Sequence, residues 1–148
     1  SHLLLLINEL KKKVSDSFVR NQSFLRSHAD SIFIISGGFK DFIVPVIEEF
    51  GLKPEHVFAN TFLFNEAGWV SGYDTNNMLS KSKGKVTLVE SLHLRGEIVV
   101  IGDGYTDYEI KAAGLASSFM LFTENVQRTE LFDKADRVVK SLDEIISN

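Results

Sequence analysis

Short apolar runs alternate along this chain with stretches in which apolar and charged positions recur at helical spacing. The apolar runs predict buried strands at residues 32–35, 98–101, 118–122 and 137–139. The amphipathic stretches predict helices at residues 3–13, 16–27, 40–50, 83–93, 108–113 and 142–147. Strands that alternate with helices are typical of an α/β fold built on a parallel sheet.

One segment departs from this alternation. Residues 62–64 and 69–73 are largely apolar and flank Asn65-Glu66-Ala67-Gly68, a pattern typical of a β-hairpin with a glycine-containing turn. Trp69 in this segment is interpreted as a packing residue. No low-complexity linker or repeat divides the sequence, so we expect a single domain over residues 1–148.

Composition excludes several classes of function. The net charge of -4, without basic clustering beyond residues 11–13, argues against a nucleic-acid partner. The apolar run at residues 3–7 is too short to cross a membrane, so no membrane partner and a cytoplasmic location are expected. Because the chain has no cysteine, any metal is expected to be held by oxygen ligands, as magnesium or calcium is.

The first candidate site is Ser36-Gly37-Gly38, which is predicted to follow a strand and precede a helix. In parallel sheets, ligands bind beyond the carboxyl ends of strands. Glycines let the backbone approach an anion, and the first amides of a helix point toward it. The alternative is that these three residues form a plain tight turn.

The second candidate is Gly102-Asp103-Gly104, with Asp107 one helical turn further on. The two carboxylates are placed to converge on one cation or on its water ligands. Alternatively, Asp107 caps the start of the following helix. A dinucleotide site, with Glu124 as the ribose-binding acid, is rejected because Asp107 occupies the position of the third glycine and would repel a pyrophosphate.

The third candidate is the basic run Lys81-Ser82-Lys83-Gly84-Lys85, where a helix is predicted to begin. A lysine at the start of a helix is unfavourable with the helix dipole. A phosphate or carboxylate partner would explain its presence. The alternative is a solvated basic turn.

Taken in order, Ser36, Lys83, and the pair Asp103 and Asp107 resemble the second, third and fourth motifs of the haloacid-dehalogenase superfamily of phosphotransferases. The likeness extends to the phosphoserine phosphatases of that superfamily. It covers nearly everything from Phe33 to the end of the chain. The segments that carry it are residues 35–39, 57–60, 72–74, 83–86, 101–107 and 124–126.

The resemblance implies a Rossmann-like core with a parallel sheet and a small β-hairpin. It implies that Ser36 and the amides of Gly37 and Gly38 bind phosphate, which Lys83 neutralises. It further implies that Asp103 ligates Mg²⁺, with Asp107 supporting the metal and the lysine. Phosphoryl transfer depends on such positioned positive charge.

The sequence departs from this family at its nucleophile. Members attack with the first aspartate of an Asp-x-Asp motif and use the second as acid and base. No two aspartates of this chain are separated by two positions. The chain therefore resembles the C-terminal part of a phosphatase, with residues 1–30 as a remnant of the cap and linking helices and residues 31–148 as the core. We expect it to be inactive alone and to bind magnesium weakly or not at all.

The resemblance also implies that the first, central strand of the sheet is missing. The strands at residues 32–35 and 98–101 would then have unpaired edges. We therefore expect a homo-oligomer or an exchange of segments between chains.

Two functions remain open on this basis. One is hydrolysis of O-phosphoserine to serine and phosphate, in L-serine biosynthesis, by the complete parent of this chain. The other is a non-catalytic phosphate-binding or regulatory module, attached to another serine-pathway enzyme such as phosphoglycerate dehydrogenase.

Overall fold

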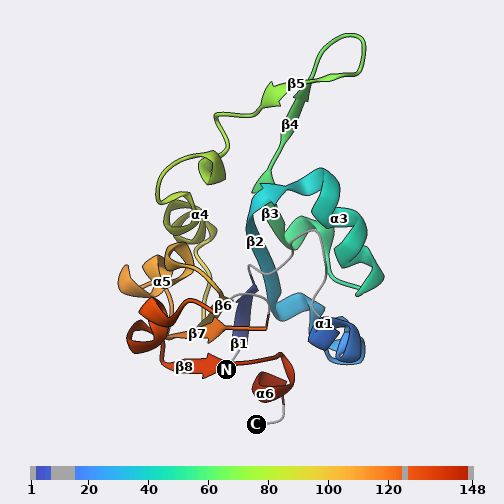
Figure 1. The fold of residues 1–148 in the computed structure, drawn as a ribbon. Coiled ribbons are helices and arrows are strands. Elements are labelled where there is room, and N and C mark those ends of the chain that lie inside the picture. Colours follow the sequence, from blue (N-terminus) through green and yellow to red (C-terminus); the bar gives the residue numbers. More distant parts are fainter. Residues whose placement is uncertain (1–2, 8–15, 125–126, 147–148) are drawn as a thin grey trace.

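A six-stranded, wholly parallel sheet forms the centre of the molecule, with the strand order β3-β2-β1-β6-β7-β8. The computed structural model describes residues 3–7, 16–124 and 127–146. Helices cover both faces of the sheet (Figure 1). The strands are β1 (Leu3–Ile7), β2 (Ile32–Phe39), β3 (Val57–Asn60), β6 (Glu97–Gly102), β7 (Ser118–Phe122) and β8 (Arg137–Val139).

Two hydrophobic clusters hold the three layers together. In β6, Val99 and Ile101 belong to one cluster, and Ile98 and Val100 belong to the other. Alternate side chains of a strand point to opposite faces, so a strand covered on both sides is apolar throughout. The first cluster includes residues of α1 (Asp16–Arg20), α2 (Gln22–Ser27) and α3 (Lys40–Glu49), with residues of α6 (Asp143–Ile146) packed against it. The second includes residues of α4 (Gly84–Leu92), α5 (Tyr105–Ala112) and the 3₁₀ turn Thr129–Lys134.

Most predicted elements are present. The predicted bounds of β7 and β8 are those observed, and the predicted helix at residues 16–27 is interrupted at Asn21 between α1 and α2. Shorter 3₁₀ turns lie at Ala29–Ser31, Pro54–His56 and Met78–Ser80. None of the helices in the described ranges is long and apolar enough to cross a membrane.

The N-terminal segment is the main correction. Leu3–Ile7 was expected to begin a helix, but it forms β1. Leu5 of this strand lies opposite Ile32 of β2 on one side and opposite Val99 of β6 on the other. Five consecutive apolar residues suit a strand at the centre of a covered parallel sheet. The rest of the predicted helix, residues 8–13, lies outside the described residues.

The central position of the sheet, which we expected to be empty, is thus filled by the chain's own β1. The α/β class, the parallel sheet and the hairpin are confirmed, and the prediction that the central strand is missing is wrong. Segment exchange between chains was expected because of that gap, so the filled position removes the reason to expect it. The division of the chain at residue 30 stays a prediction, except that residues 3–7 are part of the sheet.

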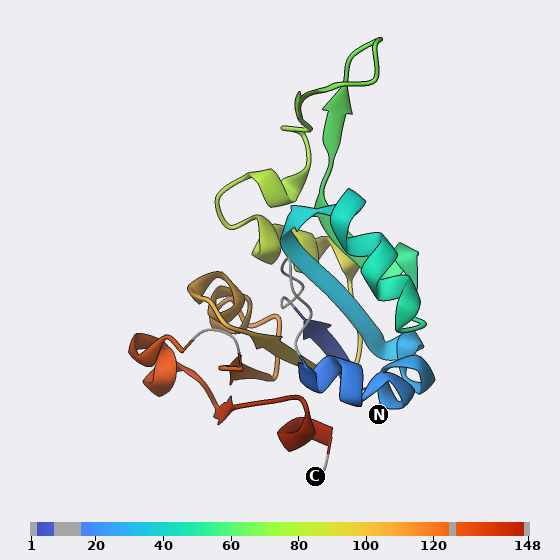
Figure 2. The same cartoon turned by 45° about the vertical axis from the view of Figure 1, so that its right-hand side comes forward.

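The hairpin consists of β4 (Phe62–Phe64) and β5 (Val70–Tyr73) and projects away from the sheet (Figures 1 and 2). Its base is anchored by Phe62, whose ring stacks on Phe39 with 3.9 Å between centroids. Trp69 is 74% exposed, so the expectation that it packs was wrong. The hairpin carries it beyond the core.

Asp136 links the loop before β8 to the rest of the sheet. Its carboxylate accepts the Phe119 amide at 2.7 Å and the Lys111 ammonium at 2.9 Å. The amide first, and then the lysine, hold the pKa of Asp136 below its ordinary value of 3.8. The charged form is therefore favoured in the folded state.

We expect Asp136→Asn to lower stability at neutral pH. A depressed pKa contributes stability above the unfolded value, and that contribution disappears as the pH falls through the folded value. The difference between wild type and variant should thus narrow below pH 3.8. Urea denaturation at a series of pH values measures this difference in the free energy of unfolding. Asp133→Asn removes the same charge at an exposed position and serves as the control; an equal effect of both variants would contradict the assignment.

Candidate functional site

The carboxyl ends of β2 and β6 bring two of the predicted residues to the same edge of the sheet. Ile34 of β2 lies opposite Ile7 of β1, which lies opposite Ile101 of β6. Ser36 lies two residues after Ile34, and Asp103 lies two residues after Ile101. Two strand spacings of about 4.8 Å separate their backbones by about 10 Å. Ligands of open α/β sheets bind at this edge.

Ser36 lies inside β2 and not in the loop we predicted. The strand continues to Phe39, and its pairing with β3 shifts between Ile35 and Phe39. The Ser36 hydroxyl is buried and accepts the Gly38 amide at 3.0 Å. The Ser-Gly-Gly segment therefore runs directly into α3, whose first residue is Lys40.

The two aspartates lie in one buried turn at the end of β6. Asp103 is 5% exposed and Asp107 is 1% exposed. Asp107 Oδ2 accepts the Gly104 amide at 3.1 Å, so this residue does cap the start of α5. A Cβ atom on Gly102 would lie 2.3 Å from Asp107 Oδ2, so the close approach of the carboxylate requires glycine at that position.

The lysine that meets Asp107 is Lys85, and the sequence analysis missed it. Its Nζ atom lies 3.0 Å from Asp107 Oδ1 and donates to Thr106 Oγ1 at 2.9 Å. The side chain of Lys85 is 12% exposed. The basic run at residues 81–85 was the available signal, but it did not indicate which lysine pairs with Asp107.

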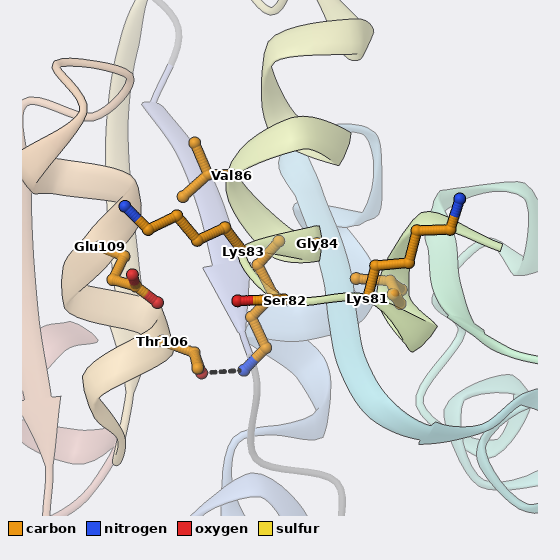
Figure 3. A pocket seen from close by; sticks show the side chains of 9 residues that line it. Lys81, Ser82, Lys83, Gly84, Val86, Thr106 and Glu109 are labelled. Atoms are coloured by element: carbon orange, nitrogen blue, oxygen red, sulfur yellow. Dashed lines mark hydrogen bonds between the residues drawn. The ribbon is translucent and has the colours of Figure 1, made fainter. Parts of the chain in front are cut away.

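Lys83 is placed differently. Its side chain is exposed, and its backbone has a φ of 56°, in the left-handed region, at the residue before α4. It lines a pocket of about 310 Å³ between the starts of α4 and α5 (Figure 3). In that view Lys81 extends away from Thr106 and Glu109. Three lysines against the single carboxylate of Glu109 make the lining positive.

The resemblance assigns magnesium to Asp103 and makes Asp107 the partner of a lysine. Oxygen ligands are correct for this ion. Asp107 accepts hydrogen bonds from Gly104 and from Lys85, which leaves the carboxylate of Asp103 as the candidate ligand. Within the described ranges, no group of three or more histidine, aspartate or glutamate side chains is placed to hold a metal.

Comparison with known proteins agrees with this arrangement. The chain is 32% identical over 144 residues to "Phosphoserine phosphatase" of Drosophila melanogaster. The alignment covers 95% of this chain and 53% of the relative. It is 34% identical over 128 residues to the human protein of the same name, which covers 84% of this chain and 56% of the relative. The chain is a homologue of the phosphoserine phosphatases, in the haloacid-dehalogenase superfamily.

The fold of this phosphoserine phosphatase homologue is also similar to a solved structure. The chain superposes on a phosphoserine phosphohydrolase-like protein from Francisella tularensis with a TM-score of 0.78 and 27% identity. The superposition covers 90% of this chain and 62% of that protein. No family model matches the sequence. The chain spans about half the length of the curated relatives it matches.

Proposed function

We propose that this chain carries the phosphate-binding and lysine-bearing part of a phosphomonoester hydrolase whose substrate is O-phosphoserine. The supporting observation is the parallel register that brings Ser36 and Asp103 to one edge, with the ion pair of Lys85 and Asp107 beside it. The names of the homologous enzymes support the substrate. A cytoplasmic location and a role in serine biosynthesis are part of the same proposal.

The chemistry assigned to these residues is electrostatic. A phosphoryl group in transfer carries charge on its oxygens, and positioned donors lower the barrier. The Ser36 hydroxyl, the amide of Gly37 and the exposed ammonium of Lys83 are the donors we assign to phosphate, and the amide of Gly38 instead positions the hydroxyl of Ser36. Asp103 is the carboxylate we assign to Mg²⁺, which would neutralise charge on the phosphate oxygens when bound, and Asp107 is held by the Lys85 ammonium.

The covalent steps of the reaction are not assigned to this chain. A nucleophilic aspartate and its acid–base partner, two positions apart, do not occur in the sequence. The chain alone is therefore proposed to bind phosphate without releasing it from an ester.

The test is phosphate release from O-phosphoserine. Pure chain should show no more turnover than its Asp103→Asn variant. A chain that begins at residue 8 leaves the central place of β1 open. When it is refolded with a separately made N-terminal segment of a homologous phosphoserine phosphatase, which carries Asp-x-Asp, turnover should be restored. Ser36→Ala should lower the restored rate about 100-fold, as removal of one transition-state donor does.

Ser27→Ala, on the exposed surface of α2, is the matched control and should leave the restored rate unchanged. Turnover by the pure chain that disappears in Asp103→Asn would overturn the proposed inactivity. Phosphate binding by calorimetry with no turnover in the reassembled protein would instead favour a non-catalytic phosphate-binding module, the second candidate. The absence of Asp-x-Asp is what favours that candidate.

A further inference from the structure

The β4-β5 hairpin presents a continuous apolar face. Residues directly opposite one another in an antiparallel pair lie on the same face, so Phe62 with Tyr73 and Phe64 with Val70 share one face of the hairpin. Phe42 of α3 extends this face, because its ring meets that of Phe62 edge-on with 5.9 Å between centroids. We call these five residues the aromatic face.

Most of the aromatic face is open to solvent. Phe42 is 69% exposed, Phe64 is 56%, Val70 is 55% and Tyr73 is 50%. Soluble proteins rarely expose contiguous apolar patches, and those that do so use them for interaction. A two-stranded hairpin is also only marginally stable in water by itself. Contact with another surface would therefore stabilise the hairpin.

The edge of β5 is less suited to a partner than the aromatic face is. The pairing of the two strands shifts between Leu63 and Phe64, so Ser71 is an extra residue in β5. Such a bulge bends the strand and interrupts the row of backbone donors and acceptors that an added strand would need. Side-chain packing on the aromatic face is therefore the more favourable mode of association.

The chemistry of the aromatic face fits the same face of a second copy. Residues 62–64 and 70–73 include no charged side chain, and Glu66 and Asp74 lie at the tip and at the base of the hairpin. A two-fold contact would thus pack rings against rings and leave the carboxylates at the rim. The hairpin projects away from the sheet, so a second molecule can reach this face (Figures 1 and 2).

We propose that this chain forms a two-fold dimer in which the aromatic faces of two hairpins pack against one another. The exposed parts of Phe42, Phe64 and Tyr73 offer about 350 Å² per chain, from the usual size of such side chains. Val70 and the neighbouring backbone add to this area. The total stays below the ~800 Å² per partner of a standard interface, so the dimer is a weak one. Because a two-fold contact uses the same patch on both copies, assembly stops at two.

Sedimentation velocity over a range of concentrations tests the proposal with the full chain. Wild type should pass from monomer to dimer between about 1 and 500 µM, the range of a weak interface, without larger species. Added salt should not weaken the dimer, since each copy has a net charge of -4 and screening reduces their repulsion. Amide hydrogen exchange in the hairpin should slow as the concentration rises.

Substitutions on the two faces of the hairpin make the result specific. Phe64→Ser and Tyr73→Ser should each raise the Kd of the dimer at least about tenfold, as loss of an aromatic anchor does. Trp69→Ser is the matched control. Trp69 precedes Val70, and successive side chains of an extended chain point to opposite faces, so this substitution removes a still more exposed ring from the other face. It should leave the Kd unchanged. All three positions are exposed, so the Tm of the monomer should be nearly the same in each variant.

A wild-type chain that stays monomeric throughout this range would overturn the proposal. Equal weakening by Trp69→Ser and Phe64→Ser would also overturn it, because it would indicate unspecific association of apolar surface. A third contrary result is displacement of the second copy by the separately made N-terminal segment of a homologous phosphoserine phosphatase, which would assign the aromatic face to the rest of the parent enzyme. None of these measurements depends on phosphate release, so failure of the proposed function would leave the dimer standing.

Discussion

A chain shortened to begin at residue 8, without β1, is expected to lose its cooperative fold. β1 lies between β2 and β6 and pairs with β6 along its whole length and with β2 through Leu5, Leu6 and Ile7. Without it, the pair β3-β2 and the group β6-β7-β8 face one another with unpaired backbone in the middle of the sheet, which folded proteins do not tolerate. The loss should exceed about 5 kcal/mol, the lower end of typical domain stability. Urea denaturation followed by circular dichroism measures it.

A point substitution tests the same role without shortening the chain. Leu5→Pro removes one backbone donor from a strand with neighbours on both sides and should be severely destabilising. Leu5→Val keeps that donor and suits a strand, so it is the matched control. A shortened chain with the same unfolding transition as the full one would show that β1 is not needed at the centre.

Gly84→Ala is expected to destabilise the protein, although helix propensity alone favours alanine by about 1 kcal/mol. Gly84 is the first residue of α4, and a Cβ atom there would lie 2.0 Å from the Met78 carbonyl oxygen. Backbone cannot rotate away as a side chain can, so α4 would be displaced. We expect a net loss of about 2–3 kcal/mol, in the range of overpacked sites. That corresponds to a fall in Tm of about 5–10 °C for a chain of this size.

Gly72→Ala is the matched control for this substitution. No atom of the described residues lies within 4 Å of a Cβ atom built on Gly72, and that residue lies in the exposed strand β5. Its Tm should be nearly unchanged. If Gly84→Ala raised the Tm instead, the gain in helix propensity would exceed the cost of the contact with Met78. The turn at Met78 would then have to shift at little energetic cost.

Several strands were predictable from the sequence. The runs at β6 and β7 are apolar, short and flanked by polar residues, because clusters on both faces of the sheet cover them. The same kind of run at residues 3–7 was misread, because the lysines that follow it suggested an amphipathic helix. What decides its structure is pairing with β6, whose sequence lies far along the chain.

The site was predictable in its residue types more than in its contacts. The sequence placed Asp103 and Asp107 together, and the structure buries both in one turn. It favoured Lys83, whereas Lys85 meets Asp107. Lys85 lies in α4, whereas Lys83 precedes this helix in the left-handed region, so their side chains leave the backbone in different directions. Which lysine reaches Asp107 depends on how α4 packs against α5, and no local pattern records that packing.

The central place of β1 also has a consequence for the order in which this protein folds. β1 pairs with β2 and β6, and β6 is synthesised after β2. Leu3 therefore cannot pair with Glu97 of β6 until that strand has been made. Pairings between such distant segments close slowly, since the loop between them must first be ordered. During synthesis one edge of the most apolar strand therefore stays open until most of the chain has emerged, and association with other chains competes with folding in that interval.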